Sequence, residues 1–307
     1  MKRLQNKISE SRMTLPVVAV YAALVWAAVG LVPGRLWLQF ACFAVSTYLM
    51  VELNNANALI RMYSRMVSCA FIVLSCAAPF QFGEVGGAAA EALAIASIAT
   101  LFGSYQDKQA AGLTFYAFMC LSLGSLFCVH ILYYIPVMWL LMAAFIRSIS
   151  ARTMVASVLG VALPYWFAVP IMAYAGKLDA LAAHFRPLAE VDGMGDFSPL
   201  AACHWATIAL VTVAAVTGII HYRRQCLGDK IRTRMFYNCF VTIFLASAAL
   251  LAALPRLHDM ALRMMTVSAS PLIAHFIALT STKVTNAAFH ALVAAALAVT
   301  AFNLWMH

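Results

Sequence analysis

Apolar runs long enough to cross a lipid bilayer follow one another along the chain, separated by short polar connections. A hydrocarbon core of about 30 Å is crossed by an α-helix of about 20 residues. On this scale the pattern predicts about eleven spans, at residues 14–32, 36–56, 66–82, 91–105, 110–129, 131–146, 153–176, 200–221, 236–254, 264–282 and 286–305. We therefore predict an all-α fold, a polytopic transmembrane helix bundle in which residues 1–307 form a single integral membrane domain.

The composition agrees with a membrane protein. The chain is 64% apolar and 10% charged, whereas soluble domains average roughly 45–50% apolar and about 25% charged residues. The first apolar run follows a basic segment, 1–13, but exceeds the roughly 7–15 residues of a signal-peptide core, so we interpret it as an uncleaved span. The net charge of +9 comes from short basic clusters between the runs. This placement indicates topology signals and lipid-headgroup contacts rather than nucleic-acid binding.

Basic residues are distributed unequally between the two sides that these spans define. With the N-terminus in the cytoplasm, fifteen of the twenty Lys and Arg residues lie on the cytoplasmic side. Cytoplasmic loops carry such an excess, so we predict a cytoplasmic N-terminus. The cytoplasmic set is Lys2, Arg3, Lys7, Arg12, Arg61, Arg65, Lys108, Arg147, Arg152, Arg223, Arg224, Lys230, Arg232, Arg234 and Lys283. The outer set is Arg35, Lys177, Arg186, Arg256 and Arg263.

Two predicted loops are longer than turns. The outer loop, 177–199, has an amphipathic first half and a tail rich in Gly, Asp and Pro, which predicts an interfacial helix followed by a turn. The cytoplasmic loop, 221–235, carries five basic residues and one acid. Each Lys or Arg close to an anionic membrane surface contributes about 1 kcal/mol. We therefore predict anionic-lipid contacts for Arg223, Arg224, Lys230, Arg232 and Arg234.

A polar segment, VELNNANALIRMYSR, closes the second span. If the helix continues, Asn54, Asn57, Arg61 and Arg65 share one face, whereas Glu52 lies about 160° from Asn54. An ionisable residue inside the hydrocarbon normally faces a partner or a water-filled cavity. These five residues are the candidates for a polar intramembrane or headgroup-binding site. The alternative is that they form interhelical hydrogen bonds and a headgroup anchor.

Three predicted cytoplasmic helix ends share an Arg-rich pattern: IRMYSRM at 60–66, IRSISARTM at 146–154 and IRTRMFYN at 231–238. One interpretation is that each Arg anchors its own helix at the headgroup layer. The other is that the three ends form a shared basic pocket for an anionic lipid head. The His and Cys residues show neither HxxxH nor CxxC spacing, so we predict no metal and no cofactor, and reduced cysteines that serve as packing residues.

Four stretches carry a resemblance to a known group of proteins: NANALIRMYSRM, AGLTFYAFMCLSLGSLFCVHILYYIPVMWLL, VLGVALPYWFAV and GDKIRTRMF. In these stretches the chain resembles an uncharacterised family of polytopic bacterial envelope proteins, with an Asn and Arg-x-x-x-Arg pattern, two apolar helix motifs and a basic loop near two thirds of the length. The resemblance covers most of the chain. It implies a multi-pass protein of the bacterial inner membrane without an assigned activity.

Residues 111–127 are also similar, more distantly, to a helix of the C-type membrane glycosyltransferases that use polyprenyl-phosphate sugars. Those enzymes rely on an acid in the first outer loop. Here that loop, 33–37, holds Arg35 and no acid, so Glu84 or Glu91 of the next outer loop would have to act as the catalytic residue. This departure favours a non-catalytic relative.

Three functions fit these features. The favoured one is a non-enzymatic subunit or scaffold of an envelope-building or secretion complex, with membrane lipids, especially anionic headgroups, and other envelope membrane proteins as partners. The second is an enzyme that acts on a lipid-linked sugar at the outer face. The third is a lipid or small-molecule transporter or flippase with Glu52 and Asn57 in a central pathway.

Overall fold

The computed structural model describes residues 4–190 and 194–306, and within these ranges the chain is helical, with no strand. The α-helices are α1 (Leu4–Glu10), α2 (Thr14–Val29), α3 (Trp37–Asn57), α4 (Met66–Cys76), α5 (Val85–Phe102), α6 (Ala111–Phe127), α7 (Tyr134–Leu141), α8 (Ala151–Tyr174), α9 (Leu178–Ala189), α10 (Ala202–Gln225), α11 (Ile231–Ala253), α12 (His258–Leu279) and α13 (Lys283–Met306). The short elements are η1 (Pro79–Gln81), η2 (Val129–Tyr133), η3 (Met142–Ile146), η4 (Cys226–Gly228) and η5 (Pro255–Leu257).

Within the described ranges, seven helices are long and apolar enough to cross a membrane. They are Val85–Phe102, Val129–Ile146, Ala151–Tyr174, Ala202–Gly228, Ile231–Ala253, Pro255–Leu279 and Lys283–Met306. The pair α1 and α2, bent by 91°, raises the number to eight if it is one span. A helix lies in each of the eleven ranges predicted from the sequence, but α4 and α6 are short, with 11 and 17 residues. The all-helical, multi-pass class is thus confirmed, whereas the number eleven stays a prediction.

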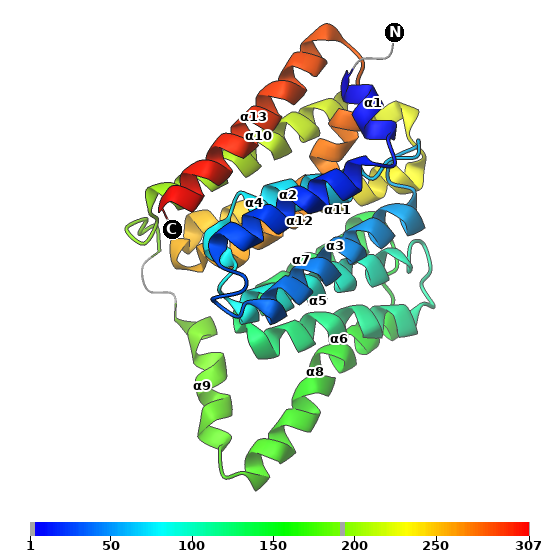
Figure 1. Cartoon of the computed structure of the whole chain (residues 1–307). Helices are drawn as coiled ribbons and strands as arrows, with labels where there is room; N and C mark the ends of the chain where they lie inside the picture. The colour runs from blue at the N-terminus through cyan, green and yellow to red at the C-terminus, as the bar shows by residue number, and fades with distance from the viewer. Residues whose placement is uncertain (1–3, 191–193, 307) are drawn as a thin grey trace.

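Helix α12 forms the centre of the bundle (Figure 1). In its candidate span, Pro255–Leu279, 94% of an 18-residue stretch is buried inside the protein. It packs against α4, α10 and α11, and Gly218 of α10 lies directly on the α12 backbone, where a Cβ atom would come within 2.4 Å of the Leu272 carbonyl carbon. Small residues at helix contacts allow such close approach, which strengthens dispersion contacts where lipid offers no hydrophobic driving force between helices.

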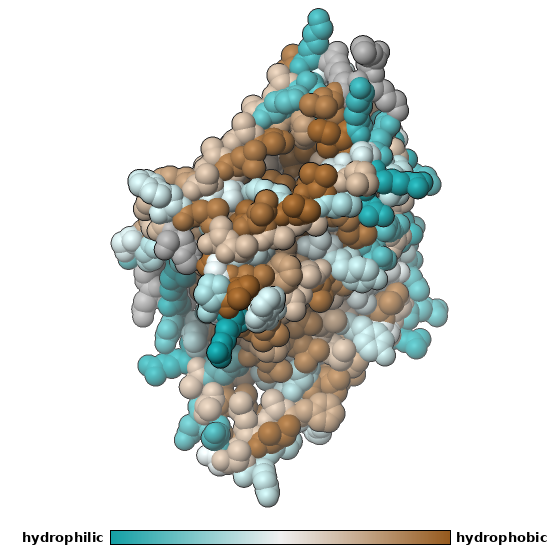
Figure 2. Space-filling model, in the orientation of Figure 1, coloured by the Kyte–Doolittle hydropathy of each residue, from teal (hydrophilic) through white to brown (hydrophobic). Residues whose placement is uncertain are grey.

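The connections of the bundle gather at two ends (Figure 1). We call the end that carries the connections 58–65, 103–110, 147–150, 226–230 and 280–282 the basic end. The opposite end carries the connections 30–36, 77–84, 175–177, 194–201 and 254–257. Polar residues lie mainly at the two ends of the molecule, and the visible face between them is mainly apolar (Figure 2). This distribution is typical of a bundle that crosses lipid, although which end faces the cytoplasm stays a prediction.

Helix α8 diverges from the bundle and α9 returns towards it at the opposite end (Figure 1). Helix α9 corresponds to the helix predicted in the 177–199 loop. A hydrogen bond from Tyr133 Oη to the Leu188 carbonyl, 2.9 Å long, holds its backbone. A turn follows, in which the Ser198 N–H donates to Asp196 Oδ1 and lowers the pKa of that carboxyl below its ordinary value. The predicted order of helix and turn is confirmed, and the interfacial position of the helix stays a prediction.

Candidate functional site

A buried ion cluster lies among α5, α12 and η1, towards the opposite end. The Arg263 side chain is only 5% exposed, and its Nη1 donates to Glu91 Oε2 at 3.1 Å. Its Nε donates to Asp259 Oδ2 at 3.0 Å and its Nη2 to the Gln81 carbonyl at 2.6 Å. Gln81 Nε2 in turn donates to the Asp259 carbonyl. The cluster therefore ties three elements together through one guanidinium.

The two catalytic candidates from the sequence, Glu84 and Glu91, lie in different environments. Glu91 is buried and engaged by Arg263, whereas Glu84 is exposed at the start of α5. The cavity beside the ion cluster has a volume of about 20 Å³ and is lined in part by Trp26, Ser46 and Ser75. A space of this size holds about one water molecule. Glu91 thus faces a guanidinium and a water-sized space rather than an open acidic pocket.

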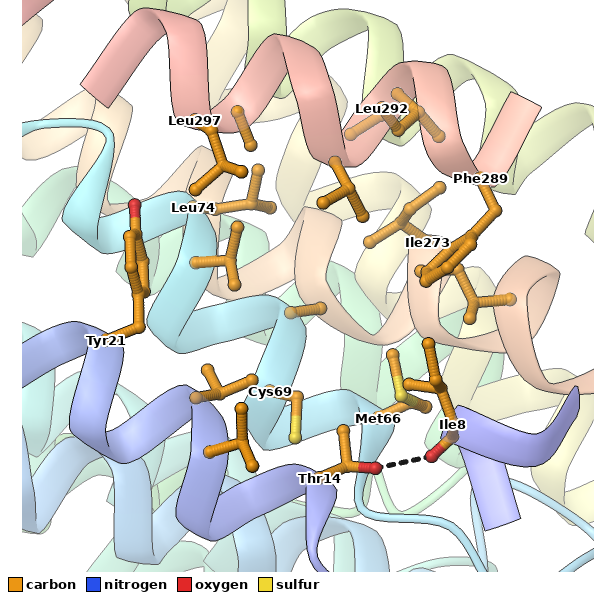
Figure 3. Close-up of a pocket in the computed structure, with 18 of the residues that line it drawn as sticks. Ile8, Thr14, Tyr21, Met66, Cys69, Leu74, Ile273, Phe289, Leu292 and Leu297 are labelled. Atoms are coloured by element: carbon orange, nitrogen blue, oxygen red, sulfur yellow. Dashed lines mark hydrogen bonds between the residues drawn. The ribbon is translucent and has the colours of Figure 1, made fainter. Parts of the chain in front are cut away.

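An apolar slot of about 650 Å³ opens between α2 and α13, above a floor of α4, α10 and α12 (Figure 3). Aliphatic side chains such as Val73, Leu74 and Ile273 line its interior, and Lys7 of α1 is its one charged lining residue among the residues described. On the molecular surface the slot lies in the hollow below α13, bordered by apolar residues (Figure 2). No local sequence pattern predicts this slot, because its two walls come from helices at opposite ends of the chain.

The polar segment after the second predicted span does not form one continuous helical face. Helix α3 ends at Asn57, and Ala58 adopts the left-handed conformation with φ 46°, so Arg61 and Arg65 lie in the connection that follows. Of the four residues predicted to share one helical face, only Asn54 and Asn57 lie on the helix, and both are buried. The physical reason is that the Asn side chains compete for backbone hydrogen bonds at a helix end.

Asn54 and Asn57 each have a local backbone partner. Asn54 Nδ2 donates to the Ser64 carbonyl at 2.9 Å, and Asn57 Nδ2 donates to the Leu53 carbonyl at 3.0 Å. Glu52 is exposed on α3, away from both. The structure therefore brings the two Asn residues into the packing of the bundle and leaves Glu52 outside that contact.

Two Arg-rich segments predicted from the sequence meet at the basic end. Arg232 Nη2 donates to Asn57 Oδ1 at 3.5 Å, and Arg61 Nη1 donates to the Gly228 carbonyl at 3.4 Å. The Arg232 guanidinium also lies 5.2 Å from the ring centre of Phe236 and 5.8 Å from that of Tyr105. Stacking of a guanidinium on aromatic rings orients it and leaves its charge available.

The third Arg-rich segment is connected to the same place through the backbone. The Gln106 N–H, next to Tyr105, donates to the Ile146 carbonyl at 2.8 Å, directly before Arg147. The Arg-rich ends at 60–66, 146–154 and 231–238 are therefore neighbours at the basic end. This arrangement is compatible with the interpretation of a shared basic surface, which the sequence had left open.

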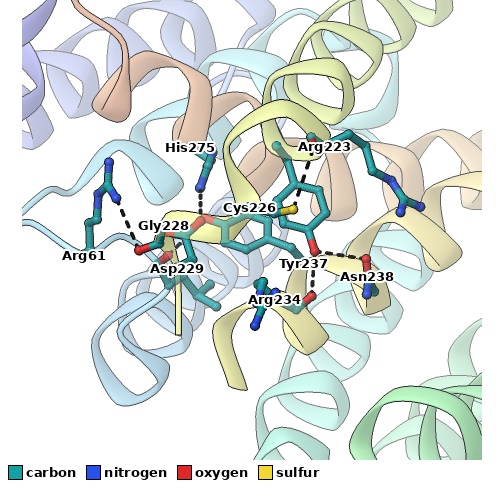
Figure 4. A network of polar contacts seen from close by, with 11 residues as sticks. Arg61, Arg223, Cys226, Gly228, Asp229, Arg234, Tyr237, Asn238 and His275 are labelled. Atoms are coloured by element: carbon teal, nitrogen blue, oxygen red, sulfur yellow. Dashed lines mark hydrogen bonds and ion pairs between the residues drawn. The ribbon is translucent and has the colours of Figure 1, made fainter. Parts of the chain in front are cut away.

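Asp229, the one acid of the 221–235 loop, is buried in contact with His275 and does not neutralise the basic surface (Figure 4). His275 Nε2 lies 2.9 Å from Asp229 Oδ2, and the two side chains are 0% and 3% exposed. Because a carboxylate only accepts, Nε2 carries the proton of this hydrogen bond. The sequence analysis missed the pair: Asp229 was visible as a lone acid among cations, but nothing local connects it to a residue 46 positions away.

Seven of the Lys and Arg residues that the sequence analysis named as candidates lie at the basic end, and we call this set the basic rim. The basic rim consists of Arg61, Arg65, Arg223, Arg224, Lys230, Arg232 and Arg234. Across residues 4–190 and 194–306, no salt bridge joins any of them to a carboxylate. Arg223, Arg224, Lys230 and Arg232 are exposed, and so are the apolar neighbours Leu227 and Ile231, at 85% and 61%. The described part of the chain also holds no group of three or more His, Cys, Asp or Glu residues suited to a metal ion.

Comparison of the chain with protein-family models, with curated proteins and with solved structures finds no match.

Proposed function

We propose that this protein is a non-enzymatic membrane scaffold of the bacterial inner membrane, with eleven spans and a cytoplasmic N-terminus, whose basic rim binds the headgroups of anionic lipids. The observation that carries the proposal is that the rim cations have no carboxylate partner among the residues that the structure describes. Asp229 lies within the same loop and could neutralise one of them, but it is bonded to His275 instead. The positive charge of the rim therefore stays available to an external anion.

The geometry of the rim supports headgroup binding in two further ways. Arg232 is held over two aromatic rings, so less side-chain entropy is lost when it binds an anion. Exposed Leu227 and Ile231 flank Lys230 and fit the boundary between headgroups and acyl chains. A loop that combines cations with exposed apolar residues gains from both electrostatic attraction and apolar burial at an anionic membrane surface.

The interior supports a scaffold rather than an enzyme. Glu91, which lines the cavity beside the ion cluster, is bound by Arg263, and the candidates Asn54 and Asn57 hydrogen-bond to the backbone. A buried, hydrogen-bonded ion pair restricts packing alternatives between helices and is poorly suited to transfer a proton to a substrate. These contacts favour a fixed bundle that presents its ends to lipids and to other envelope membrane proteins.

The proposal is tested by changing Arg223, Arg224, Arg232 and Arg234 together to Gln. At about 1 kcal/mol for each cation, and about tenfold for each 1.4 kcal/mol, co-purified acidic phospholipid should fall by more than about tenfold. Lipid extraction followed by mass spectrometry measures the ratio of acidic to zwitterionic lipid.

A matched control changes four cations of the opposite end to Gln, namely Arg35, Lys177, Arg186 and Arg256. It produces the same change in net charge and should retain the acidic lipid. Equal lipid ratios in the two quadruple variants would show that the rim has no special role.

The proposed orientation has its own test. Leu227 is 85% exposed in the loop of the rim, so Leu227→Cys in a cysteine-free background provides a single labelling site. We expect an impermeant maleimide to label it only after the cells are opened, whereas Met194→Cys, at the opposite end, should react in intact spheroplasts. The reverse pattern would invert the proposed topology.

A further inference from the structure

The slot between α2 and α13 is closed at both of its ends. Towards the opposite end, the Tyr21 hydroxyl on α2 lies 2.8 Å from the Thr300 hydroxyl on α13 and joins the two walls. At the basic end, α1 crosses the gap: the Gln5 N–H donates to Asn286 Oδ1 at 3.3 Å, and Gln5 Nε2 donates to the Ile277 carbonyl at 2.8 Å. The slot is therefore a bounded cavity with a lateral mouth, rather than a gap that continues along the whole bundle.

The length of the slot matches part of one lipid leaflet. Its α13 wall extends from Phe289 to Leu297, nine residues whose ends are about 12 Å apart along a helix. The hydrocarbon core of a bilayer is about 30 Å thick, so the slot is shorter than half of the core, and its α1 and α2 walls begin at the basic end. A partner helix is about 10–12 Å wide and would need a groove that continues across the membrane. The closed ends exclude such a partner and favour a thin, flexible chain.

The polarity of the slot gives its occupant a direction. Lys7 and Ser11 belong to the lining and flank the α1–α2 bend. Figure 3 shows Ile8 and Thr14 at this end of the slot and Tyr21, whose hydroxyl is bonded to Thr300, towards the other. Met66, another lining residue, directly follows Arg65 of the basic rim. The occupant should therefore be an amphiphile whose negative head lies near Lys7 and Arg65 and whose apolar tail extends towards Tyr21.

We propose that the slot binds one acyl chain of an anionic phospholipid from the leaflet at the basic end. The inference rests on the proposed function of the rim, and it adds a tail site to the headgroup contacts. The volume of about 650 Å³ lies within the roughly 300–1,000 Å³ usual for small-ligand pockets. A chain in the slot is in contact with protein on several sides, whereas a chain in the surrounding lipid exchanges freely, so a lipid bound here is retained during purification.

The test uses phosphatidylglycerol with a photoreactive diazirine in its acyl chain, incorporated in nanodiscs with the full-length protein. Ala296 on α13 is 3% exposed and lines the slot. Ala296→Phe fills the space next to it and should reduce labelling of the slot-lining residues in the α4 and α13 peptides to the background that bulk photoreactive lipid gives on exposed helix faces. The matched control is Ala295→Phe, which places the same side chain on the exposed side of α13 and should retain the labelling.

A second variant covers the case in which Ala296→Phe fails to fold. Val293 is 41% exposed at the mouth of the slot, so Val293→Trp should block entry without disturbing the core. Labelling of α4 and α13 that persists in the folded slot variants overturns the inference. Equal labelling by diazirine phosphatidylcholine, or no effect of Lys7→Gln, overturns the anionic head assignment.

The quadruple rim variant separates the two proposals. If it keeps its acidic lipid while Ala296→Phe loses the label, the proposed function fails and the slot remains a tail site. If it loses its acidic lipid while Ala296→Phe keeps the label, the slot inference fails and the rim function stands.

Discussion

Replacement of Arg263 is the most direct test of how the bundle is held together. The Arg263→Met variant keeps a side chain of similar length and removes the guanidinium that donates to Glu91, Asp259 and the Gln81 carbonyl. Glu91, with a side chain 10% exposed, is then left without its cation. Asp259 is 29% exposed and can regain water. The cost of the substitution therefore lies mainly in Glu91 and the Gln81 carbonyl.

The magnitude follows from that burial. Removal of one partner from a buried ion pair costs about 3–5 kcal/mol, because an uncompensated charge or an enforced protonation remains in the interior. The double variant Arg263→Met with Glu91→Leu removes both charges and should recover most of this loss, since buried pairs replaced by apolar residues are often close to neutral. Glu91→Gln keeps an acceptor for Arg263 and should cost about 1–3 kcal/mol.

The assay is unfolding by sodium dodecyl sulfate in mixed micelles, followed by tryptophan fluorescence. Arg256→Met is the matched control at the same end of the bundle, because Arg256 lies 3.8 Å from a Glu190 side chain that is 43% exposed. Such exposed pairs contribute about 0–1 kcal/mol. If the free energy of unfolding of Arg263→Met lies within about 1 kcal/mol of that of the parent protein, the ion cluster does not stabilise the bundle. A double variant no more stable than Arg263→Met would refute the reasoning in the same way.

Two further predictions concern contacts between distant segments. Asp229→Ala leaves His275 Nε2 without an acceptor and should lower the free energy of unfolding by about 1–3 kcal/mol. It should also increase the rate at which trypsin cleaves the 226–234 segment in mixed micelles. An unchanged cleavage rate would argue against a role of the pair in holding this loop. Gly218→Ala places a Cβ atom 2.4 Å from the Leu272 carbonyl carbon and should lower the stability against unfolding by sodium dodecyl sulfate. The control Gly112→Ala has no atom within 4 Å of the added carbon and should not lower it. Equal effects of the two variants would contradict the close packing of α10 on α12.

The sequence by itself determined the class of the protein and the approximate place of its helices. Both depend on local properties: hydropathy summed along a run, the positions of Lys and Arg between runs, and the amphipathic pattern that became α9. It also identified the cations that gather at the basic end, because each lies in a connection between apolar runs. It did not show that α3 ends at Asn57, since a continued helix was equally compatible with the spacing of the polar residues.

Only the tertiary structure decided which side chains meet. Glu91 and Arg263 are 172 positions apart, and Asp229 and His275 are 46 apart. The slot is built from α1 and α2 at one end of the sequence and α13 at the other. The physical reason is that hydropathy places a helix in the membrane but leaves its rotation and its neighbours undetermined; these are set by close packing at small residues and by the need of buried polar groups for partners.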